Sequence, residues 1–200
     1  MIKAIAFDLG GVIFDFDFTI ALNSFSRGNQ VLAEKILDDI LKNGFTEEYE
    51  KGLITTEHFY QKFIASYGLV LDFTTFLKFW TEIFTPNQAV IQLLYKLKER
   101  YPLYLISNTC ETHYDYLTKE FPQPFSVFND VILSYLVHSV KPEEKIYSVL
   151  KVKADRDYEE ILYIDDRRDL IENAADLGLI SFQFKNHQDL IKQLEEKKVL

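Results

Sequence analysis

The feature that most constrains this 200-residue chain is a set of four short apolar runs, each followed by polar residues. The runs cover residues 2–7, 103–106, 131–133 and 161–164. Short runs with almost no apolar–polar alternation are typical of strands that are buried on both faces. A fifth run, residues 180–184, indicates a strand near the edge of the same sheet.

Amphipathic helical patterns lie between these runs. Thr85 is predicted to cap one helix, with Pro86 in its first turn and apolar residues at helical spacing up to Leu97. Residues 141–144 open a second helix, 169–177 form a third that Gly178 ends, and 189–197 form a fourth. Strands that alternate with helices predict an α/β fold with a doubly wound parallel sheet.

Residues 19–84 contain no convincing strand pattern and read as helical. A first helical stretch covers residues 20–41, with a break expected at residues 27–29. Thr55 or Thr56 is predicted to cap a helix that Gly68 ends, and Asp72 to cap another that runs through Phe84. We therefore predict a small helical cap domain at residues 15–85, inserted into a core domain made of residues 1–14 and 86–200. The aromatic stripe of this region is expected to form the core of the cap; its members are Phe59, Phe63, Phe76, Phe79, Trp80 and Phe84.

Composition narrows the function classes. Hydrophobic residues make up 48% and charged residues 26%, as in globular proteins and unlike disordered ones. The 22 basic and 31 acidic residues give a net charge of −9, and the basic residues are scattered, so we expect no nucleic-acid partner. The single cysteine, Cys110, cannot form an internal disulfide and is interpreted as a packing residue. With no signal-peptide pattern and no apolar stretch of membrane-spanning length, we expect no membrane association and a cytoplasmic location.

The residues that follow the strands are predicted to meet. Ligands bind at the carboxyl ends of the strands in an open parallel sheet. Asp8, Ser107 with Asn108, Lys141, and Asp165 with Asp166 are all expected at that edge. Three carboxylates placed together repel one another unless a cation lies among them.

These residues and their order resemble the haloacid dehalogenase-like (HAD) hydrolases over the whole chain. Four motifs carry the resemblance: Phe7-Asp8-Leu9-Gly10-Gly11-Val12, then Ile106-Ser107-Asn108-Thr109, then Lys141-Pro142, and finally Asp165-Asp166. The run Phe14-Asp15-Phe16-Asp17-Phe18 and the Gly two residues after Asp8 are similar to the bacterial branch that includes α-D-glucose-1-phosphate phosphatases. The resemblance implies a Rossmann-like HAD core with an inserted cap.

The resemblance also implies a role for each motif. Asp8 is the expected nucleophile, forming an aspartyl-phosphate. Ser107 and backbone N–H groups near Asn108 are expected to hold the phosphoryl oxygens, and Lys141 to supply a fixed positive charge. The expected function is a Mg²⁺-dependent phosphatase of small phosphorylated metabolites, with a sugar phosphate favoured.

The carboxylates receive more than one interpretation. Asp8, Asp166 and the Gly10 carbonyl are the expected Mg²⁺ ligands. Asp165 is either another ligand or a hydrogen-bond acceptor that lies next to the ligands without binding the metal. Asp15 is a candidate contact for a sugar hydroxyl. Asp169 is expected to orient Lys141 or its loop rather than to bind the metal.

One position departs from the family pattern. Typical phosphatases of the family have a second Asp two residues after the nucleophile, where this chain has Gly10. That Asp serves as general acid and base, which is usually worth about 10²–10⁴-fold in rate. Two alternatives therefore stay open: a 2-haloacid dehalogenase, which uses an equivalent Asp without metal, and an inactive module that only binds or regulates.

Overall fold

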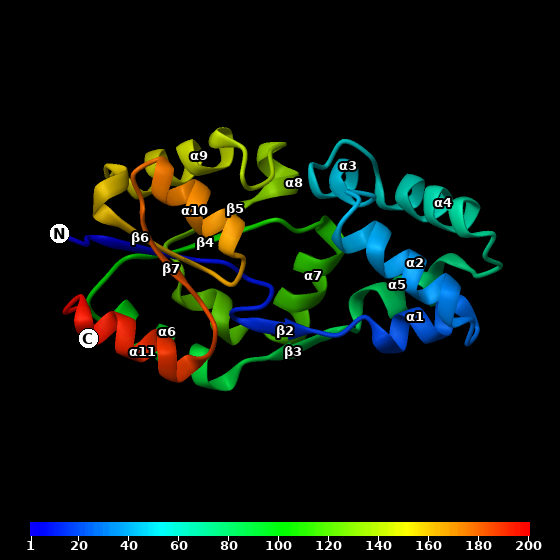
Figure 1. Ribbon diagram of the computed structural model, residues 1–200, viewed down its shortest axis with the longest axis horizontal. Helices are drawn as coiled ribbons and strands as arrows, with labels where there is room; N and C mark the ends of the chain where they lie inside the picture. Colours follow the sequence, from blue (N-terminus) through cyan, green and yellow to red (C-terminus); the bar gives the residue numbers. More distant parts are fainter.

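The protein has two lobes, one built on a β-sheet and one made of helices (Figure 1). The structure is a computed structural model that describes the backbone of residues 1–200 and all side chains except that of Ile20. The sheet lobe holds a five-stranded parallel sheet in the order β5-β4-β1-β6-β7. Its strands are β1 (Ala4–Phe7), β4 (Leu103–Ser107), β5 (Asp130–Leu133), β6 (Ile161–Asp165) and β7 (Ile180–Gln183). The α/β prediction is confirmed, and β7 lies at the sheet edge as expected.

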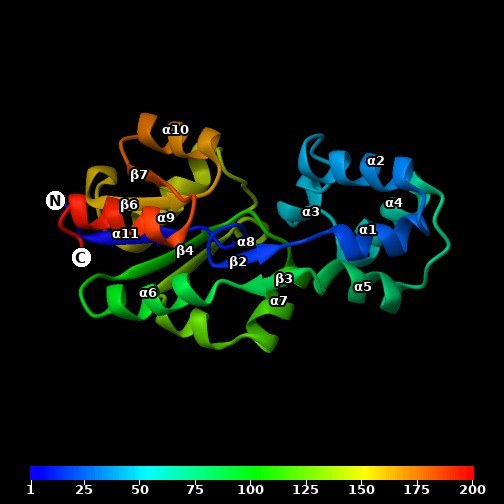
Figure 2. The same ribbon diagram turned by 60° about the horizontal axis from the view of Figure 1, so that its bottom comes forward.

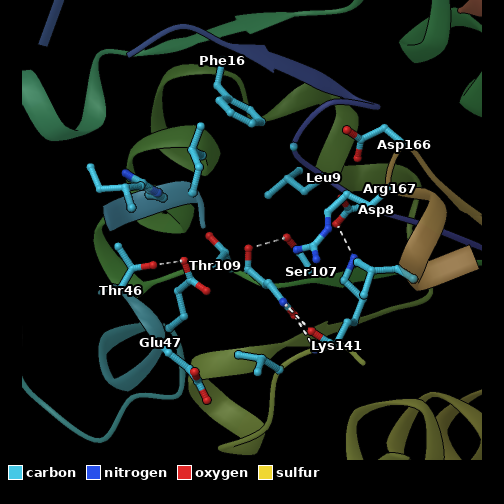
Figure 3. A pocket seen from close by; sticks show the side chains of 18 of the residues that line it. Asp8, Leu9, Phe16, Thr46, Glu47, Ser107, Thr109, Lys141, Asp166 and Arg167 are labelled. Atoms are coloured by element: carbon cyan, nitrogen blue, oxygen red, sulfur yellow. Dashed lines mark hydrogen bonds and ion pairs between the residues drawn. The ribbon is translucent and has the colours of Figure 1, made fainter. Parts of the chain in front are cut away.

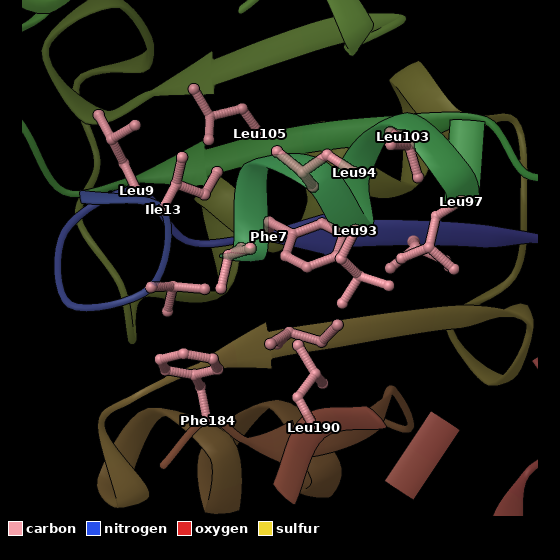
Figure 4. Close-up of a cluster of buried hydrophobic side chains, with 14 of the residues drawn as sticks. Phe7, Leu9, Ile13, Leu93, Leu94, Leu97, Leu103, Leu105, Phe184 and Leu190 are labelled. Atoms are coloured by element: carbon pink, nitrogen blue, oxygen red, sulfur yellow. The ribbon is translucent and has the colours of Figure 1, made fainter. Parts of the chain in front are cut away.

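Helices cover both faces of the sheet because alternate strand residues point to opposite sides. Ile5 and Phe7 of β1 pack in one apolar cluster with α6, α7 and α11, part of which Figure 4 shows. Ala4 and Ala6 pack in a second cluster with α9 and α10. The bounds of these helices are α6 (Gln88–Lys98), α7 (Glu111–Glu120), α9 (Glu144–Ala154), α10 (Arg168–Asp176) and α11 (His187–Glu196). Short segments α8 (Ser134–Val137), η1 (Gln123–Val127) and η2 (Tyr158–Glu160) complete the lobe.

The predicted start of the helix after the cap was wrong. Thr85 and Pro86 belong to a short strand, and α6 begins after Asn87, whose side chain accepts a hydrogen bond from the Val90 N–H. Asn is as good an N-cap as Thr, so local sequence alone did not separate the two. The predicted end of the third helix is confirmed, since Gly178 follows α10 with a φ of 100°.

Five helices form the second lobe: α1 (Thr19–Ser26), α2 (Gln30–Leu41), α3 (Glu47–Glu50), α4 (Thr56–Tyr67) and α5 (Phe73–Thr81). The break before α2 is where it was expected, and Thr55 and Asp72 cap α4 and α5 through their side chains. Helix α5 ends before Phe84, which was predicted to be helical. None of the helices in the described structure has the length and apolar character needed to cross a membrane.

The helical lobe has an apolar core of its own, rich in aromatic rings. Phe59, Phe63, Phe76 and Trp80 are buried, and each ring lies within 6.2 Å of a neighbour in the group. Phe79 and Phe84 pack against the same cluster from partly exposed positions. The aromatic stripe therefore forms the core of this lobe, as predicted. The extent of the cap domain, residues 15–85, stays a prediction.

A short antiparallel ribbon connects the lobes and was not predicted. It pairs β2 (Phe14–Phe16) with β3 (Phe84–Pro86). The segment that leaves the sheet lobe and the segment that returns to it therefore lie side by side (Figure 2). Three-residue strands are too short to show a period, which is why the pattern missed them.

Candidate functional site

A cleft of about 630 Å³ lies where the carboxyl ends of the strands face the helical lobe. Its walls include the predicted site residues Asp8, Gly10, Ser107, Asn108, Lys141 and Asp166. Figure 3 labels four of them: Asp8, Ser107, Lys141 and Asp166. Asp8 directly follows β1, Ser107 ends β4, and Asp166 follows β6. The strand ends therefore bring together residues that lie up to 158 positions apart.

Asp8 is nearly buried at 8% exposure and pairs with one cation. Its backbone N–H bonds the Ile164 carbonyl of β6 at 2.9 Å, which fixes the position of the residue against the sheet. Its Oδ1 lies 2.8 Å from Lys141 Nζ. Burial raises the pKa of Asp8 to about 7, against the opposing effect of Lys141. Asp8 can thus exist as a carboxylate near neutral pH, poorly solvated and accessible from the cleft.

Lys141 is the buried cation of the site, with 3% exposure. Besides Asp8 it contacts Asp165 Oδ2 at 2.7 Å and the Ile106 carbonyl at 3.3 Å. Burial on its own would lower the pKa of Lys141, but Asp165 and Asp8 outweigh it and hold that pKa above its usual value. The ammonium is therefore a permanent positive charge beside Asp8.

Asn108 holds the backbone of Lys141 in place. Its Oδ1 accepts from the Lys141 N–H at 2.7 Å, and its Nδ2 donates to the Lys141 carbonyl at 3.0 Å. Ser107 is buried at the cleft wall, where its hydroxyl lies 3.4 Å from the Asn108 carbonyl. Ser134 ties the neighbouring strand end to this loop, since its hydroxyl accepts from the Thr109 N–H and donates to the Thr109 carbonyl, each at 2.9 Å.

Three carboxylates form a group that could hold a metal ion. Oxygens of Asp8, Asp165 and Asp166 lie within 4.8 Å of one another. Burial, and then the charge of Asp165, raise the pKa of Asp166. One ammonium, that of Lys141, faces three acids, so a divalent cation with oxygen ligands fits the charge of the site.

The oxygens of Asp165 already have protein partners. Oδ1 accepts from the Arg167 N–H at 2.9 Å, and Oδ2 accepts from Lys141 and from the Tyr163 hydroxyl. Two interpretations were left open for Asp165. This geometry favours the one in which Asp165 accepts hydrogen bonds from protein groups and does not bind the metal directly. Asp8 and Asp166 then remain as the carboxylates that fit Mg²⁺, and the Gly10 carbonyl stays a predicted ligand.

Gly11 allows Asp166 to approach the loop after β1. Its φ is +73°, and a Cβ at this position would lie 2.6 Å from Asp166 Oδ2. Any other residue here would meet both a strained backbone and the carboxylate. Steric contact with Asp166 thus explains why the second Gly of the first motif, Gly11, has no side chain.

Two of the sequence candidates lie apart from these contacts. Asp15 sits on β2 with an exposed side chain and is not among the residues that line the cleft. Asp169 pairs with the Arg167 guanidinium at 2.6 Å, whereas Lys141 is oriented by Asp165. Arg167 itself lines the cleft.

The helical lobe contributes a polar wall that sequence reasoning missed. Thr46 and Glu50 line the cleft, and the Thr46 hydroxyl donates to Glu50 Oε1 at 2.8 Å. Burial raises the pKa of Glu50. On the sheet-lobe side, His113 of α7 also lines the cleft, with its ring stacked on Trp80 at 4.9 Å between centroids. No local motif marks these residues, because only the approach of the two lobes places them at the cleft.

Phe16 occupies the space beside Gly10. A Cβ at position 10 would lie 3.3 Å from the Phe16 ring, which lines the cleft and packs edge-on against Phe18. The position where the family pattern has its second Asp is therefore bordered by an aromatic ring.

Known proteins resemble the chain over nearly its full length. A D-ribitol-5-phosphate phosphatase of Bacteroides thetaiotaomicron is 28% identical, with 97% of each chain covered. A HAD family enzyme from the same species, crystallised with magnesium and inorganic phosphate, superposes with a TM-score of 0.81 at 28% identity over 92% of this chain and 95% of that one. An L-2-haloacid dehalogenase of Xanthobacter autotrophicus has a TM-score of 0.68 at 18% identity, covering 100% of this chain and 85% of the other, which shows a common fold.

The family model described as haloacid dehalogenase-like hydrolase matches residues 2–178. That span contains the four motifs and every acid, the lysine and the serine that meet in the cleft. The protein belongs to the haloacid dehalogenase-like hydrolases.

Proposed function

We propose that this hydrolase is a Mg²⁺-dependent phosphatase of small phosphorylated metabolites, with phosphates of sugars or sugar alcohols favoured. The observation that carries the proposal is Asp8, held 2.8 Å from Lys141 at the floor of the cleft and beside Asp166. The phosphatase relative and the phosphate-bound neighbour support it. We also propose that residues 15–85 form its cap domain and that it acts in the cytoplasm.

The reaction needs two displacements at phosphorus. An Asp8 oxygen attacks the phosphorus, the bond from phosphorus to the ester oxygen breaks, and the alcohol leaves with a proton taken from water or the site. Water then attacks the aspartyl-phosphate, which releases inorganic phosphate and restores the Asp8 carboxylate. Asp8 suits the attack because burial leaves its charge poorly solvated, as the raised pKa of about 7 indicates.

The remaining residues of the core wall balance the charge. Lys141 neutralises Asp8 and faces the phosphoryl oxygens, while the buried Ser107 hydroxyl can donate to one of them. Asp8, Asp166 and the Gly10 carbonyl would hold Mg²⁺, which would supply further positive charge to the transferring group. Asn108 keeps Lys141 in position through its two backbone bonds.

The cap wall favours a substrate with hydroxyl groups. Opposite the core residues, Thr46 and Glu50 present a hydroxyl and a carboxylate to the cleft. A carboxylate is a strong acceptor for hydroxyl donors. The cleft of about 630 Å³ has the size of a small-molecule site, so a phosphorylated metabolite fits better than a phosphoprotein.

Gly10 motivates a competing function, an inactive binding module. With Phe16 against Gly10, the first loop provides no side-chain acid for the leaving group. A substrate whose alcohol leaves easily, such as a glycosyl 1-phosphate, needs that acid less. Binding without turnover is therefore one explicit outcome of the test below.

The test is release of inorganic phosphate from a panel of sugar, sugar-alcohol and nucleoside phosphates, with Mg²⁺ or with EDTA. We expect turnover that needs Mg²⁺ and that Asp8→Asn abolishes. Asp176→Asn, which changes an exposed carboxylate at the end of α10, serves as the matched control and should keep its activity. Equal rates for Asp8→Asn and wild type contradict the proposal. Halide release from 2-haloacids in EDTA indicates the dehalogenase, and metabolite binding without turnover indicates the inactive module.

A further inference from the structure

The Tyr163 hydroxyl lies behind the catalytic residues and does not line the cleft. Tyr163 is on β6, fully buried, and two residues before Asp165 on the same face of the strand. It donates its hydroxyl hydrogen to Asp165 Oδ2, the oxygen that also accepts from Lys141 Nζ at 2.7 Å. Lys141 in turn contacts Asp8 at 2.8 Å, so one chain of polar contacts runs from Tyr163 to the nucleophile.

The contacts of Asp165 leave it little freedom to turn. Its Oδ1 is fixed by the Arg167 N–H at 2.9 Å, and its Oδ2 by Lys141 and Tyr163. The Tyr163 ring also faces Lys141, with Nζ 5.6 Å from the ring centroid. Asp165 has 0% exposure, so no water replaces a lost partner easily.

We propose that Tyr163 is a positioning residue that commits Asp165 to Lys141 rather than to the metal. Through Asp165 it fixes the ammonium of Lys141 at the side of Asp8 where the phosphoryl group arrives. The inference rests on the proposed function for the roles of Asp8 and Lys141. It adds one residue outside the four motifs, Tyr163, to the contacts that position Lys141.

The test compares Tyr163→Phe with Tyr104→Phe. Tyr163 and Tyr104 flank the same residue, Ala6, on β6 and β4, and both pack in the cluster on that face of the sheet. Tyr163→Phe keeps the ring against Lys141 and removes only the hydroxyl. Because a bond to a charged group is lost, we expect kcat to fall about ten-fold, with KM within about two-fold of wild type. Tyr104→Phe should leave both constants unchanged.

A second comparison tests whether Tyr163 acts through Asp165. If it does, the double variant Tyr163→Phe/Asp165→Asn should be no slower than Asp165→Asn alone. Additive losses overturn the inference. The binding of Mn²⁺, a paramagnetic stand-in for Mg²⁺, is measured by electron paramagnetic resonance. We expect Tyr163→Phe to bind Mn²⁺ like wild type and Asp166→Asn to bind it weakly; weakened binding in Tyr163→Phe also overturns the inference.

A readout without turnover separates this inference from the proposed function. Vanadate resembles the transition state of phosphoryl transfer, whereas inorganic phosphate resembles the product. We expect Tyr163→Phe to bind vanadate about ten-fold more weakly and phosphate equally well. A wild type that hydrolyses no ester contradicts the proposed function, and the vanadate comparison still decides the inference. Equal vanadate binding in the two proteins, including none in either, overturns it.

Discussion

At the scale of single residues, two opposing effects set the pKa of Asp8: burial raises it, and the neighbouring Lys141 lowers it. Burial, with a smaller effect of Asp165, raises the pKa of Asp8 to about 7 from the ordinary value of 3.8, although Lys141 opposes the shift. Between these two values the folded protein binds a proton at Asp8 that the unfolded chain has released. The contribution of Asp8 to stability is therefore fully present below pH 3.8 and is lost as pH rises through about 7.

The first prediction concerns Asp8→Asn in the absence of metal. Because Asn carries no charge to bury, the variant should gain stability relative to wild type at pH 8, by roughly 1–3 kcal/mol, and gain much less at pH 5. Urea unfolding in EDTA at the two pH values measures the difference. Asp15→Asn, at an exposed site, should show no such pH dependence; a gain for Asp8→Asn that is equal at both pH values contradicts the burial argument.

The second prediction concerns the close approach of Gly11 and Asp166. Gly11→Ala should reduce turnover by roughly 100-fold or more, because the methyl group takes the position of the Asp166 carboxylate. Gly28→Ala is a matched control, since Gly28 has a φ of +79° and open space around its Cβ position. Both variants should lose about 1 kcal/mol for the left-handed backbone, and only Gly11→Ala should lose activity. Similar activities in the two would refute the steric role.

At the scale of elements, α3 and the loop before it bring the cap to the cleft. Thr46 precedes the helix and Glu50 ends it, so one turn of helix places both polar groups on the cleft side. Glu48 of the same helix points elsewhere and pairs with Lys62 at 2.7 Å. Glu50 of this helix thus faces the cleft, whereas Glu48 pairs within the lobe.

The third prediction uses this pair of glutamates. Glu50→Gln should raise KM about ten-fold for sugar or sugar-alcohol phosphates, because a neutral amide accepts hydroxyl hydrogen bonds less strongly than a carboxylate. It should leave p-nitrophenyl phosphate unaffected, since that ester has no hydroxyl group beyond the phosphate. Glu48→Gln should change neither substrate. Equal effects of Glu50→Gln on both substrates contradict the hydroxyl-reading role.

At the scale of the whole molecule, the cap touches the core beside Lys141. Lys51 Nζ pairs with Glu143 Oε1 at 2.6 Å, and its carbonyl lies 2.8 Å from His138 Nδ1. Glu143 is two residues after Lys141, so this contact joins the cap to the loop that carries the cation. Gly52 packs against the backbone of Tyr135, where a Cβ would lie 2.3 Å from the carbonyl oxygen.

The fourth prediction tests this contact. Gly52→Ala should push the lobes apart, raise KM several-fold and speed hydrogen exchange in residues 47–52 and 134–138. Gly68→Ala is the matched control: Gly68 has a φ of +62°, close to the +64° of Gly52, but its Cβ position is free. It should lose similar stability without these changes. Unchanged exchange in Gly52→Ala would mean that the contact does not hold the lobes together.

Local patterns were enough to predict much of the fold and part of the site. Buried strands need continuous apolar runs, so their positions, and the polar residues that end them, could be read directly from the sequence. Asp72 was readable as a cap, and Thr55 as one of two candidates, because a cap bonds an N–H only a few residues away. Asp8, Ser107, Lys141 and Asp166 followed from these ends together with the family resemblance.

The tertiary structure decided what depends on contacts between distant segments. Thr85 could cap a helix by its local sequence, but pairing with Asp15 across the ribbon places it in β3. The sequence left Asp165 with two roles, and its partners Lys141 and Tyr163 favour one of them. Glu50 reaches the cleft only because the two lobes close on each other. Residue type and local order thus determined which chemistry is available, and packing over long separations decided which atoms meet to perform it.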